Sequence, residues 1–370
     1  MTTKQFIYQC EIKPISHYFF GGESSYNPAD GGRENYFVRS MLLPQQTTIL
    51  GTLRYAILNG FIDINLISNS PDFLIGPTSF NGRNDSFGII RKLSPVYILH
   101  KNKNSQEAVK LTPLRKDFFQ SNPNQNIAHL ITETNAYESS VNEVLRKETV
   151  SNINFNHKQY YFGKIWTNKN KTYFYTEQDI FKRFTITSNA KNTFSDEPLD
   201  GYFKKEVVKL LSNFSFGVDI VLSERLSHLG KFICKVGGEG SLFSFEVREC
   251  SLDDERIENS KENYDMNEDY RLTAISPLKV GSEFMNYVKG GMSSLIHFRN
   301  IRTSTKTINY AGLAQKDDLN TAFKGGKETF YDSGSVFYIH GSVLNEAIRL
   351  IEAHPAYSLI GYNQFTLEKI

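Results

Sequence analysis

Histidine is the side chain that most often acts as a general acid or base near neutral pH, and this chain has eight of them. They stand at positions 17, 100, 129, 157, 228, 297, 340 and 354, and none has a histidine or cysteine neighbour at metal-ligand spacing. His17 alone lies in a glycine-rich loop beside the first expected strand, where it could serve as a general base on RNA. A packed or hydrogen-bonded histidine is the alternative. No nucleophile-elbow, zinc-protease or phosphate-loop motif occurs, so we expect a protein without catalytic residues, metal or cofactor.

Two short stretches place cations beside aromatic residues. "NYFVRS" (35–40) contains Arg39, and "FKRF" (181–184) contains Arg183. Single-stranded RNA is bound by rings that stack on its bases and by cations that pair with its phosphates, so both stretches suit it. Each stretch alone also fits a packed aromatic residue beside a solvated cation.

A glycine-rich turn, "VGGEGS" (236–241), is a third candidate, with Gly237, Gly238 and Gly240. Because glycine has no side chain, a phosphate can come close to the backbone and accept from its N–H groups. An ordinary hairpin turn explains the same residues.

A helix is predicted over residues 44–60, "PQQTTILGTLRYAILNG". Pro44 suits its first turn and Gly60 its C-cap, while Ile49, Leu53 and Ile57 form an apolar stripe.

The first turn of this helix is polar, with Gln45, Gln46 and Thr47, and Gly51 interrupts its middle at a cost of about 1 kcal/mol relative to alanine. Side chains at a positive helix end can bond to phosphates or bases, and Gly51 would allow a close approach of another strand or an RNA. Arg54 on the same helix is a further candidate cation. A core helix whose first turn meets solvent is the alternative.

Composition limits the kind of protein. A length of 370 residues predicts two domains. The content of 39% hydrophobic and 22% charged residues predicts that the chain folds. A net charge of +2 is low for a free-standing nucleic-acid binder, so binding would depend on local patches or partner subunits. Three scattered cysteines and the lack of a long apolar run favour a reduced, cytoplasmic setting without a membrane.

The first 250 residues are predicted to form one domain, with a long insertion at about 100–195 in which basic residues outnumber acidic ones. That insertion is either a solvated loop region or a basic arm along a phosphate backbone. The expected strands are 5–15, 87–99, 214–222 and two around the glycines of 231–247, the expected helices are 44–60 and 202–211, and 16–40 is expected to be a loop.

Residues 251–269 are strongly acidic and are predicted to be a linker. The second domain, 270–370, should have strands at 270–278, 293–301, 334–341 and 360–370 and helices at 282–288 and 343–353, the latter capped by Ser342. A basic loop after 301 holds Arg302, Lys306, Lys324 and Lys327. The order βαββαβ predicts an α+β protein of two tandem ferredoxin-like (RRM-like) domains.

Several fragments together resemble one protein family. They are "HYFFGGESS", "NYFVRSMLLPQQTTILGTLRYAIL", "IGPTSF…FGIIRKLSPVYIL", "KVGGEGS" and "SGSVFYIHG", in this order. They are similar to the RAMP superfamily of CRISPR-associated proteins, in particular the third subunit of the type III-B (Cmr) effector complex. The insertion at 100–195 matches nothing in that pattern.

The resemblance implies a non-catalytic subunit that holds the 5′ handle of the guide RNA (crRNA). It also implies a position between the large polymerase-like subunit and the repeating backbone RAMP subunit. The alternatives are a RAMP endoribonuclease that processes precursor guide RNA, the equivalent type III-A subunit, and a scaffold without RNA contact. The expected RNA-binding residues are His17, Arg39, Gln45, Gln46, Thr47, Arg54, Arg183, Gly237, Gly238, Gly240, Arg302 and Lys306.

Overall fold

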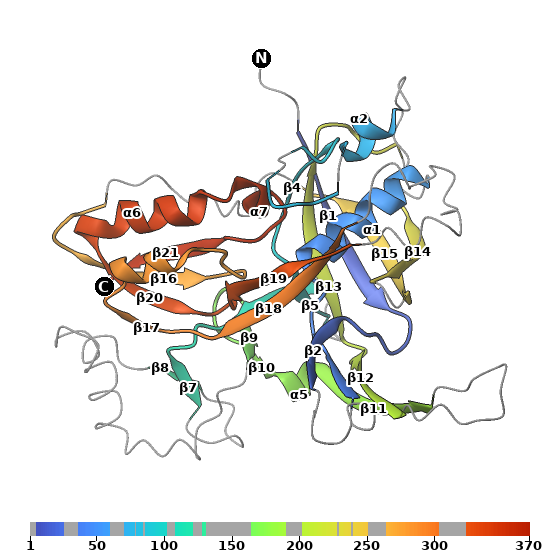
Figure 1. Cartoon of the computed structure of the whole chain (residues 1–370), viewed down its shortest axis with the longest axis horizontal. Coiled ribbons are helices and arrows are strands. Elements are labelled where there is room, and N and C mark those ends of the chain that lie inside the picture. The colour runs from blue at the N-terminus through green and yellow to red at the C-terminus, as the bar shows by residue number, and fades with distance from the viewer. Residues whose placement is uncertain are drawn as a thin grey trace.

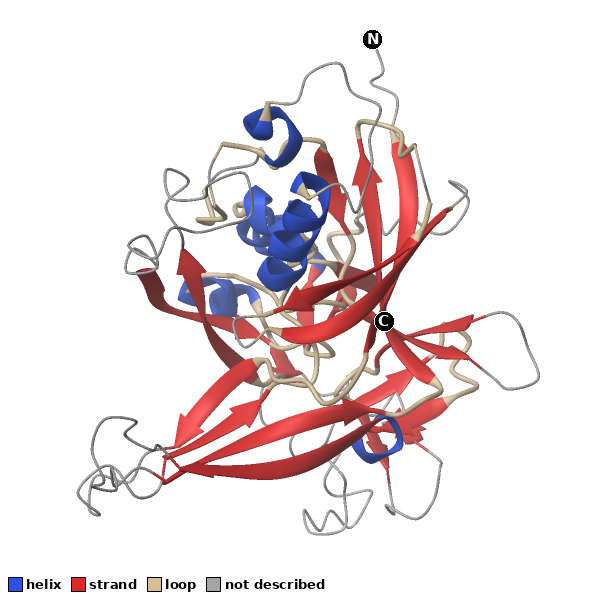
Figure 2. Cartoon of the chain, turned by 90° about the vertical axis from the view of Figure 1, so that its right-hand side faces the viewer, coloured by secondary structure: helices blue, strands red, loops and turns tan. Residues whose placement is uncertain are grey.

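The fold is taken from a computed structural model of the chain. It describes residues 5–25, 36–59, 70–77, 79–83, 86–101, 108–120, 128–130, 164–189, 202–227, 229–237, 240–250, 264–302 and 323–370. We call residues 5–250 the first half and residues 264–370 the C-terminal half. In Figure 1 most of the first half lies on the right and most of the C-terminal half on the left, and Figure 2 shows that strands are the main elements of the molecule. In the described part of the chain, no helix combines the length and apolar composition needed to cross a bilayer.

The largest sheet contains the predicted strands of the first half. Its strands are β1 (Phe6–Pro14), β4 (Ile90–Leu93), β5 (Tyr97–Lys101), β6 (Ala108–Pro113), β9 (Ile165–Thr167), β10 (Phe174–Thr176), β13 (Phe214–Leu222), β14 (Lys231–Val236) and β15 (Ser241–Glu249). The order is β10-β9-β6-β5-β13-β1-β15-β14, with β4 also paired to β13. Tyr8, Cys10 and Ile12 alternate inward on β1, which confirms the predicted strand.

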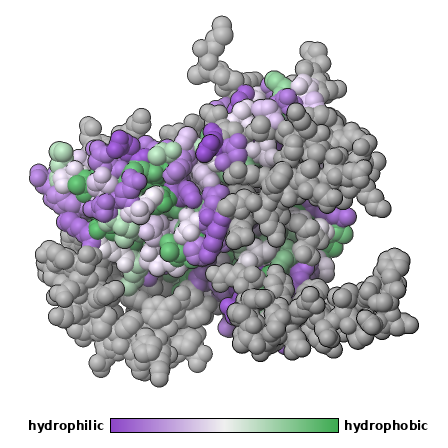
Figure 3. All heavy atoms as spheres, in the orientation of Figure 1, coloured by the Kyte–Doolittle hydropathy of each residue, from purple (hydrophilic) through white to green (hydrophobic). Residues whose placement is uncertain are grey.

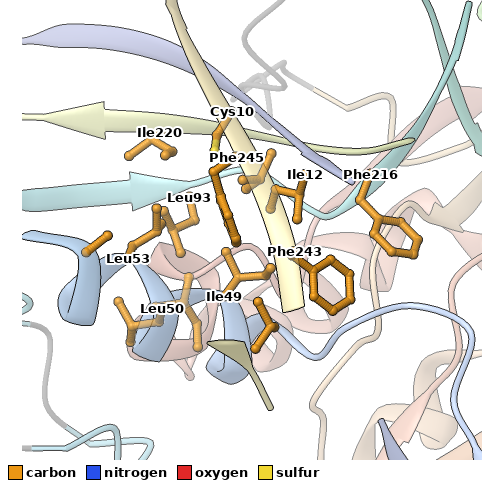
Figure 4. Packing of buried hydrophobic residues seen from close by; sticks show 14 of the residues in the cluster. Cys10, Ile12, Ile49, Leu50, Leu53, Leu93, Phe216, Ile220, Phe243 and Phe245 are labelled. Atoms are coloured by element: carbon orange, nitrogen blue, oxygen red, sulfur yellow. The ribbon is translucent and has the colours of Figure 1, made fainter. Parts of the chain in front are cut away.

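The predicted first helix is α1 (Gln46–Leu58), and it packs on the inner face of this sheet. Ile49, Leu53 and Ile57 are buried as predicted. In Figure 4 the α1 residues Ile49, Leu50 and Leu53 lie opposite sheet residues such as Phe245. A short helix, α2 (Pro71–Ile75), follows.

A second sheet, with the order β11-β12-β3-β2, corrects two predictions. Its strands are β2 (Gly21–Ser25), β3 (Tyr36–Ser40), β11 (Phe181–Asn189) and β12 (Tyr202–Leu210), and α5 (Glu177–Ile180) precedes β11. The expected loop 16–40 therefore contains two strands. The expected helix 202–211 is wrong because β12 pairs along its whole length with β11, which supplies hydrogen bonds that local sequence does not reveal.

The C-terminal half has a four-stranded antiparallel sheet in the order β17-β20-β16-β21. Its elements are β16 (Asp269–Ala274), the 3₁₀-helix η2 (Ser282–Tyr287), β17 (Gly290–Met292), β20 (Val336–His340), α6 (Gly341–Glu352), α7 (Pro355–Leu359) and β21 (Phe365–Lys369). The predicted helix 282–288 is thus a 3₁₀-helix. The N-cap of α6 is His340, whose ring nitrogen accepts from the backbone N–H of Ser342, so the predicted cap at Ser342 is wrong.

Strand 293–301 exists, but it does not join the C-terminal sheet. It is β18 (Leu295–Arg302), and it forms a separate ribbon with β19 (Phe323–Tyr331). Part of the expected basic loop, with Lys324 and Lys327, therefore lies in a strand. A second small ribbon pairs β7 (Phe118–Gln120) with β8 (Ala128–Leu130).

The region predicted as an insertion belongs partly to the main fold. It contributes β6, β9 and β10 to the largest sheet and the whole of β11 to the second one, while residues 131–163 lie outside the described part. Between β13 and β15 the described residues contain β14 and no helix, so the βαββαβ order of the first half lacks its second helix. Of the predicted linker, residues 251–263 lie outside the described part, and β16 already begins at Asp269.

The two halves share a hydrophobic core. The main core under α1 includes Phe330 of β19 and Ala356, Tyr357, Ile360 and Tyr362 from α7 and its C-terminal side. A smaller core lies between α6 and the C-terminal sheet. On the face seen in Figure 3, hydrophilic and hydrophobic residues are interspersed over the C-terminal half.

Buried charges also join the halves, on the face of the C-terminal sheet opposite α6. We call Arg115, Asp117, Arg271, Tyr338 and Glu368 the charged seam. Arg115 Nε lies 3.1 Å from Asp117 and its Nη1 3.0 Å from Glu368. Arg271 pairs with Glu368 and lies 3.8 Å from Asp117, to which the Tyr338 hydroxyl donates at 3.1 Å.

The segment after β6 brings Arg115 and Asp117 onto this sheet. The backbone N–H of Lys116 donates to the carbonyl of Gly334 at 2.8 Å, and Gly334 has a φ of +84°. A Cβ there would lie 2.6 Å from the Leu114 carbonyl oxygen, so glycine is required at this crossing. Because Asp117 and Arg271 are both 3% exposed, this sheet face is covered by the chain's own first half.

Candidate nucleic-acid interface

The structure brings the lead-in to α1 and the glycine turn next to one segment, Tyr18–Phe20. The N–H of Met41 donates to the Phe20 carbonyl at 2.8 Å, and the N–H of Phe20 donates to Ser40 Oγ at 3.0 Å. On the other side, the N–H of Phe19 donates to Ser241 Oγ at 3.3 Å. Two regions that are far apart in sequence therefore lie on either side of residues 17–20, of which His17 is exposed while Tyr18, Phe19 and Phe20 are buried.

The glycine turn has the backbone that glycine favours. Gly237 and Gly240 have φ values of +75° and +66°, and the N–H of Gly240 donates to the Gly237 carbonyl at 3.1 Å. A Cβ at Gly237 would lie 3.5 Å from the Phe20 ring, so the turn sits against residues 19–20. Gly238 lies outside the described residues.

Next to this turn, one face of the second sheet gathers cations and rings. We call His17, Phe19, Lys182, Phe184, Lys205 and Lys209 the lysine–aromatic face. Lys182 lies opposite Lys209 in the β11–β12 register, and Ile186 lies opposite Lys205, so these side chains share one face.

The contacts within the lysine–aromatic face join each ring to a basic side chain. The ammonium of Lys205 lies 4.1 Å from the centroid of the Phe19 ring, and that of Lys182 lies 5.4 Å from the Phe184 ring. His17 is exposed and meets the edge of Phe184 with ring centroids 4.8 Å apart. In the described residues no carboxylate pairs with Lys182 or Lys209, so their charges are available to a polyanion.

Arg183 points to the opposite face of the same strand, and its charge is satisfied inside the chain. It pairs with Glu206 at 2.5 Å and with Glu177 at 3.3 Å. Burial alone would lower the pKa of Arg183, but the two carboxylates raise it. Arg183 is therefore a weaker candidate for a phosphate contact than its neighbour Lys182.

The polar first turn of α1 is used within the protein. Gln46 is 4% exposed, and its amide donates to the carbonyls of Ser94 at 3.0 Å and Gly361 at 3.2 Å. The Tyr362 hydroxyl donates to Gln45 Oε1 at 2.7 Å and also contacts Thr47. These side chains hold the C-terminal segment to the first helix. Gln46 is buried and so exposes little surface to RNA, while Gln45 and Thr47 are half-buried candidates.

We expect Gln46→Ala to lower the free energy of unfolding by about 1–3 kcal/mol, because two buried carbonyls lose their donor. Chemical denaturation would measure this. A variant that binds RNA less tightly at unchanged stability would contradict the structural role.

Gly51 lies on the exposed side of α1, and a Cβ there would meet nothing of the described chain within 4 Å. Gly51→Ala is therefore expected to raise the free energy of unfolding by about 1 kcal/mol through helix propensity. Thermal melting would test this. If RNA or a partner approaches this glycine, the same variant will be more stable but bind less tightly, and unchanged binding would exclude such an approach.

Arg54 is a buried residue and not part of an open surface. It is 9% exposed, and its guanidinium carbon lies 5.5 Å from the Phe87 ring. Burial lowers the pKa of this guanidinium to about 10. The helix turns Arg54 toward the 86–89 segment, so little of this side chain is exposed to RNA, and RNA binding by Arg54 stays an untested prediction.

Of the other predicted residues, Arg39 is exposed on β3, with its guanidinium carbon 5.8 Å from the Phe37 ring. Arg302 ends β18, and Lys306 lies outside the described residues. Sequence reasoning missed Lys205 and Lys209, since residues 202–211 were expected to be helical, and it missed Phe19 within the expected loop 16–40. Lys205, Val207 and Lys209 share one face of β12, and their mixed polarity gives no clean strand periodicity in the sequence.

A cleft of about 1400 Å³ lies between residues of the two halves near the start of α1. Its walls are largely apolar and include Leu43, Val96, Trp166 and Ile296. Of the charges around it, Lys164 pairs with Asp332 at 2.8 Å. This cleft therefore offers phosphates little positive charge compared with the lysine–aromatic face.

The described residues contain no group of three or more His, Cys, Asp or Glu side chains that could hold a metal ion.

Comparison with known proteins identifies the family. A model of a CRISPR-associated protein family, Cas_Cmr3, matches residues 10–367. No curated protein sequence matches the chain.

The fold is similar to a chain in a solved structure described as a cryo-EM structure of the type III-B Cmr-beta bound to cognate target RNA. The TM-score is 0.50 at 16% identity, with 97% of this chain and 96% of that chain covered. A chain of a type III-A Csm3–Csm4 subcomplex gives a TM-score of 0.36 at 14% identity, covering 90% and 97%. Because the family model spans almost the whole sequence, this chain belongs to the Cas_Cmr3 family of CRISPR-associated proteins.

Proposed function

We propose that this chain is a non-catalytic, guide-RNA-binding subunit of a type III-B CRISPR effector ribonucleoprotein. It holds the 5′ handle of the guide RNA and bridges the large polymerase-like subunit to the repeating backbone subunit. Membership of the family supports the setting. The observation that carries the RNA-binding role is the lysine–aromatic face beside the glycine turn.

The chemistry of that face matches single-stranded RNA. Lys182 lies over the half-buried Phe184 ring, so a phosphate bound at its ammonium would place the neighbouring base near that ring. Lys205 covers the buried Phe19 ring and adds a second positive charge to the same face. Gly237 and the exposed Arg39 border the same region. With a net charge of only +2, the isolated chain binds RNA weakly, and the complex supplies the remaining affinity.

We propose further that the chain is built from two tandem ferredoxin-like domains, and the order of elements supports this. The C-terminal half has the order strand, 3₁₀-helix, strand, strand, helix, strand, with β18 and β19 inserted. In the first half β1 lies between β13 and β15, and α1 covers one face. There β14 occupies the place in the chain where the second helix is expected.

Photocrosslinking in the reconstituted complex tests the proposal. Guide RNA carrying a photoreactive base at each handle position in turn is irradiated, and crosslinked peptides are identified by mass spectrometry. Handle crosslinks to peptides containing Phe19, Phe184 or Gly237 are expected. Crosslinks confined to other subunits would contradict the RNA-binding role.

Incubating the purified chain with repeat RNA distinguishes the endoribonuclease alternative. Uncleaved RNA is expected, because the only described contact of the His17 ring is with Phe184. Cleavage that is lost in His17→Ala would instead establish an enzyme.

A further inference from the structure

Exposed apolar side chains lie together on the outer face of the largest sheet, opposite α1. Ile233 of β14 and Leu242 of β15 are 56% and 49% exposed. Leu242 is paired with Lys235, two residues from Ile233, so the two are diagonal neighbours. Ile15 is 53% exposed, and its N–H donates to the Leu242 carbonyl at 3.0 Å. We call these three residues the apolar patch.

The patch lies at an open edge of the sheet. β14 is the last strand in the sheet order, and among the described residues no strand pairs with its outer edge. Its free backbone N–H and carbonyl groups are a template for another strand. Exposed large apolar residues at such an edge mark a surface that is covered in an assembly.

The charges around the patch indicate what covers it. Lys231 and Lys235 flank Ile233 on the same face of β14, since side chains alternate along a strand. Glu246 pairs with Lys231 at 3.0 Å, whereas in the described residues no carboxylate pairs with Lys235. Positive charge therefore dominates this edge.

This pattern disfavours a second copy of the chain. If two β14 strands paired antiparallel about Ile233, Lys231 of each would lie opposite Lys235 of the other, and like charges directly opposite are destabilising. Consider instead a partner strand in which an apolar residue has one acidic residue two positions before it and another two positions after it. Such a strand would place a carboxylate opposite each lysine.

We propose that the β14 edge and the apolar patch bind a strand of this acidic–apolar–acidic pattern from another protein subunit. The inference depends on the proposed function only in that the chain works in a multisubunit ribonucleoprotein. The glycine turn connects β14 to β15, so the docked subunit lies beside the candidate RNA interface and can contact the same RNA.

Zero-length crosslinking with a carbodiimide tests the proposal in the reconstituted complex, because it joins lysine only to a carboxylate in direct contact. The expected product joins Lys235 to an Asp or Glu of another subunit, in a segment with an apolar residue two positions away. An assembled, RNA-containing complex in which neither Lys231 nor Lys235 is joined to another subunit overturns the proposal.

Substitutions give a second test. Ile233→Lys and the charge reversal Lys235→Glu are each expected to reduce co-purification of the crosslinked subunit at least tenfold. Met266→Lys is the matched control and should have no effect, since Met266 is 61% exposed and directly precedes β16, which lies on the other side of the molecule from β14 in Figure 1. Thermal melting of each variant checks that the chain stays folded.

The outcomes separate the two proposals. Variants of the patch that are folded and assemble like the unmodified chain overturn the docking surface and leave the RNA-binding role intact. Failure of the unmodified chain to enter any complex contradicts the proposed function, and the docking proposal falls with it.

Discussion

Replacing Asp117 by alanine is expected to lower the free energy of unfolding by about 3–5 kcal/mol, the cost of breaking a buried charge network on one side. Asp117 is 3% exposed and lies between the guanidinium groups of Arg115 and Arg271. Without it, both arginines stay buried with Glu368 as the remaining carboxylate of the seam. Urea unfolding would measure the loss.

The pKa values within the seam show the opposing effects. Burial raises the pKa of Asp117 against the charges of both arginines. Burial alone would raise the pKa of Glu368 too, but its hydrogen bond from Arg271 and the two positive charges lower it. The seam therefore depends on all its charges being present together.

A surface pair provides the matched control for Asp117→Ala. Glu346 and Arg349 on α6 lie 3.0 Å apart with side chains 51% and 76% exposed. Glu346→Ala should cost less than about 0.5 kcal/mol, because water screens exposed pairs. If Asp117→Ala costs no more than Glu346→Ala, the charged seam does not hold the two halves together.

The second large effect concerns RNA. Replacing Lys182, Lys205 and Lys209 together by alanine is expected to weaken binding of the guide-RNA handle. For single-stranded RNA, the slope of log affinity against log salt concentration becomes less negative by about 0.7 for each phosphate contact that is lost. Losing three contacts should therefore make the slope less negative by about 2. RNA binding to the reconstituted complex at several salt concentrations would measure this.

Phe184→Ala should act differently from the lysine variant. Loss of a stacked base costs about 1–3 kcal/mol and leaves the salt slope unchanged, because no ionic contact is removed. Arg349→Ala removes an exposed cation from α6 and is the control for charge alone. Unchanged RNA binding in both the lysine variant and Phe184→Ala, with unchanged melting temperatures, would place the handle elsewhere.

Periodicity in the sequence was enough to predict the elements whose residues alternate cleanly between core and solvent. The strand with Tyr8, Cys10 and Ile12 and the helix with Ile49 and Leu53 were both found correctly, because burial on one face leaves a period of two or 3.6. The glycine turn was also recognisable, since positive φ values favour glycine.

Residues 202–211 show where local pattern fails. Val207, Leu210 and the residues between them fit a helical spacing as well as a strand. The decision depends on pairing with β11 and β3, which lie elsewhere in the chain. Since strand pairing is a long-range interaction, the lysine–aromatic face could not be predicted from that stretch alone.

The order of residues was enough to infer the family and the types of side chain that suit RNA, but which of these side chains are available depends on the folded chain. Lys182 and Arg183 are adjacent in one strand, yet Arg183 meets Glu206 and Glu177 while Lys182 lies over an aromatic ring. Gln46 was chosen as an RNA ligand and is instead buried against Ser94 and Gly361. The physical reason is that a polar group binds whatever partner folding places beside it, and those partners lie far away in sequence.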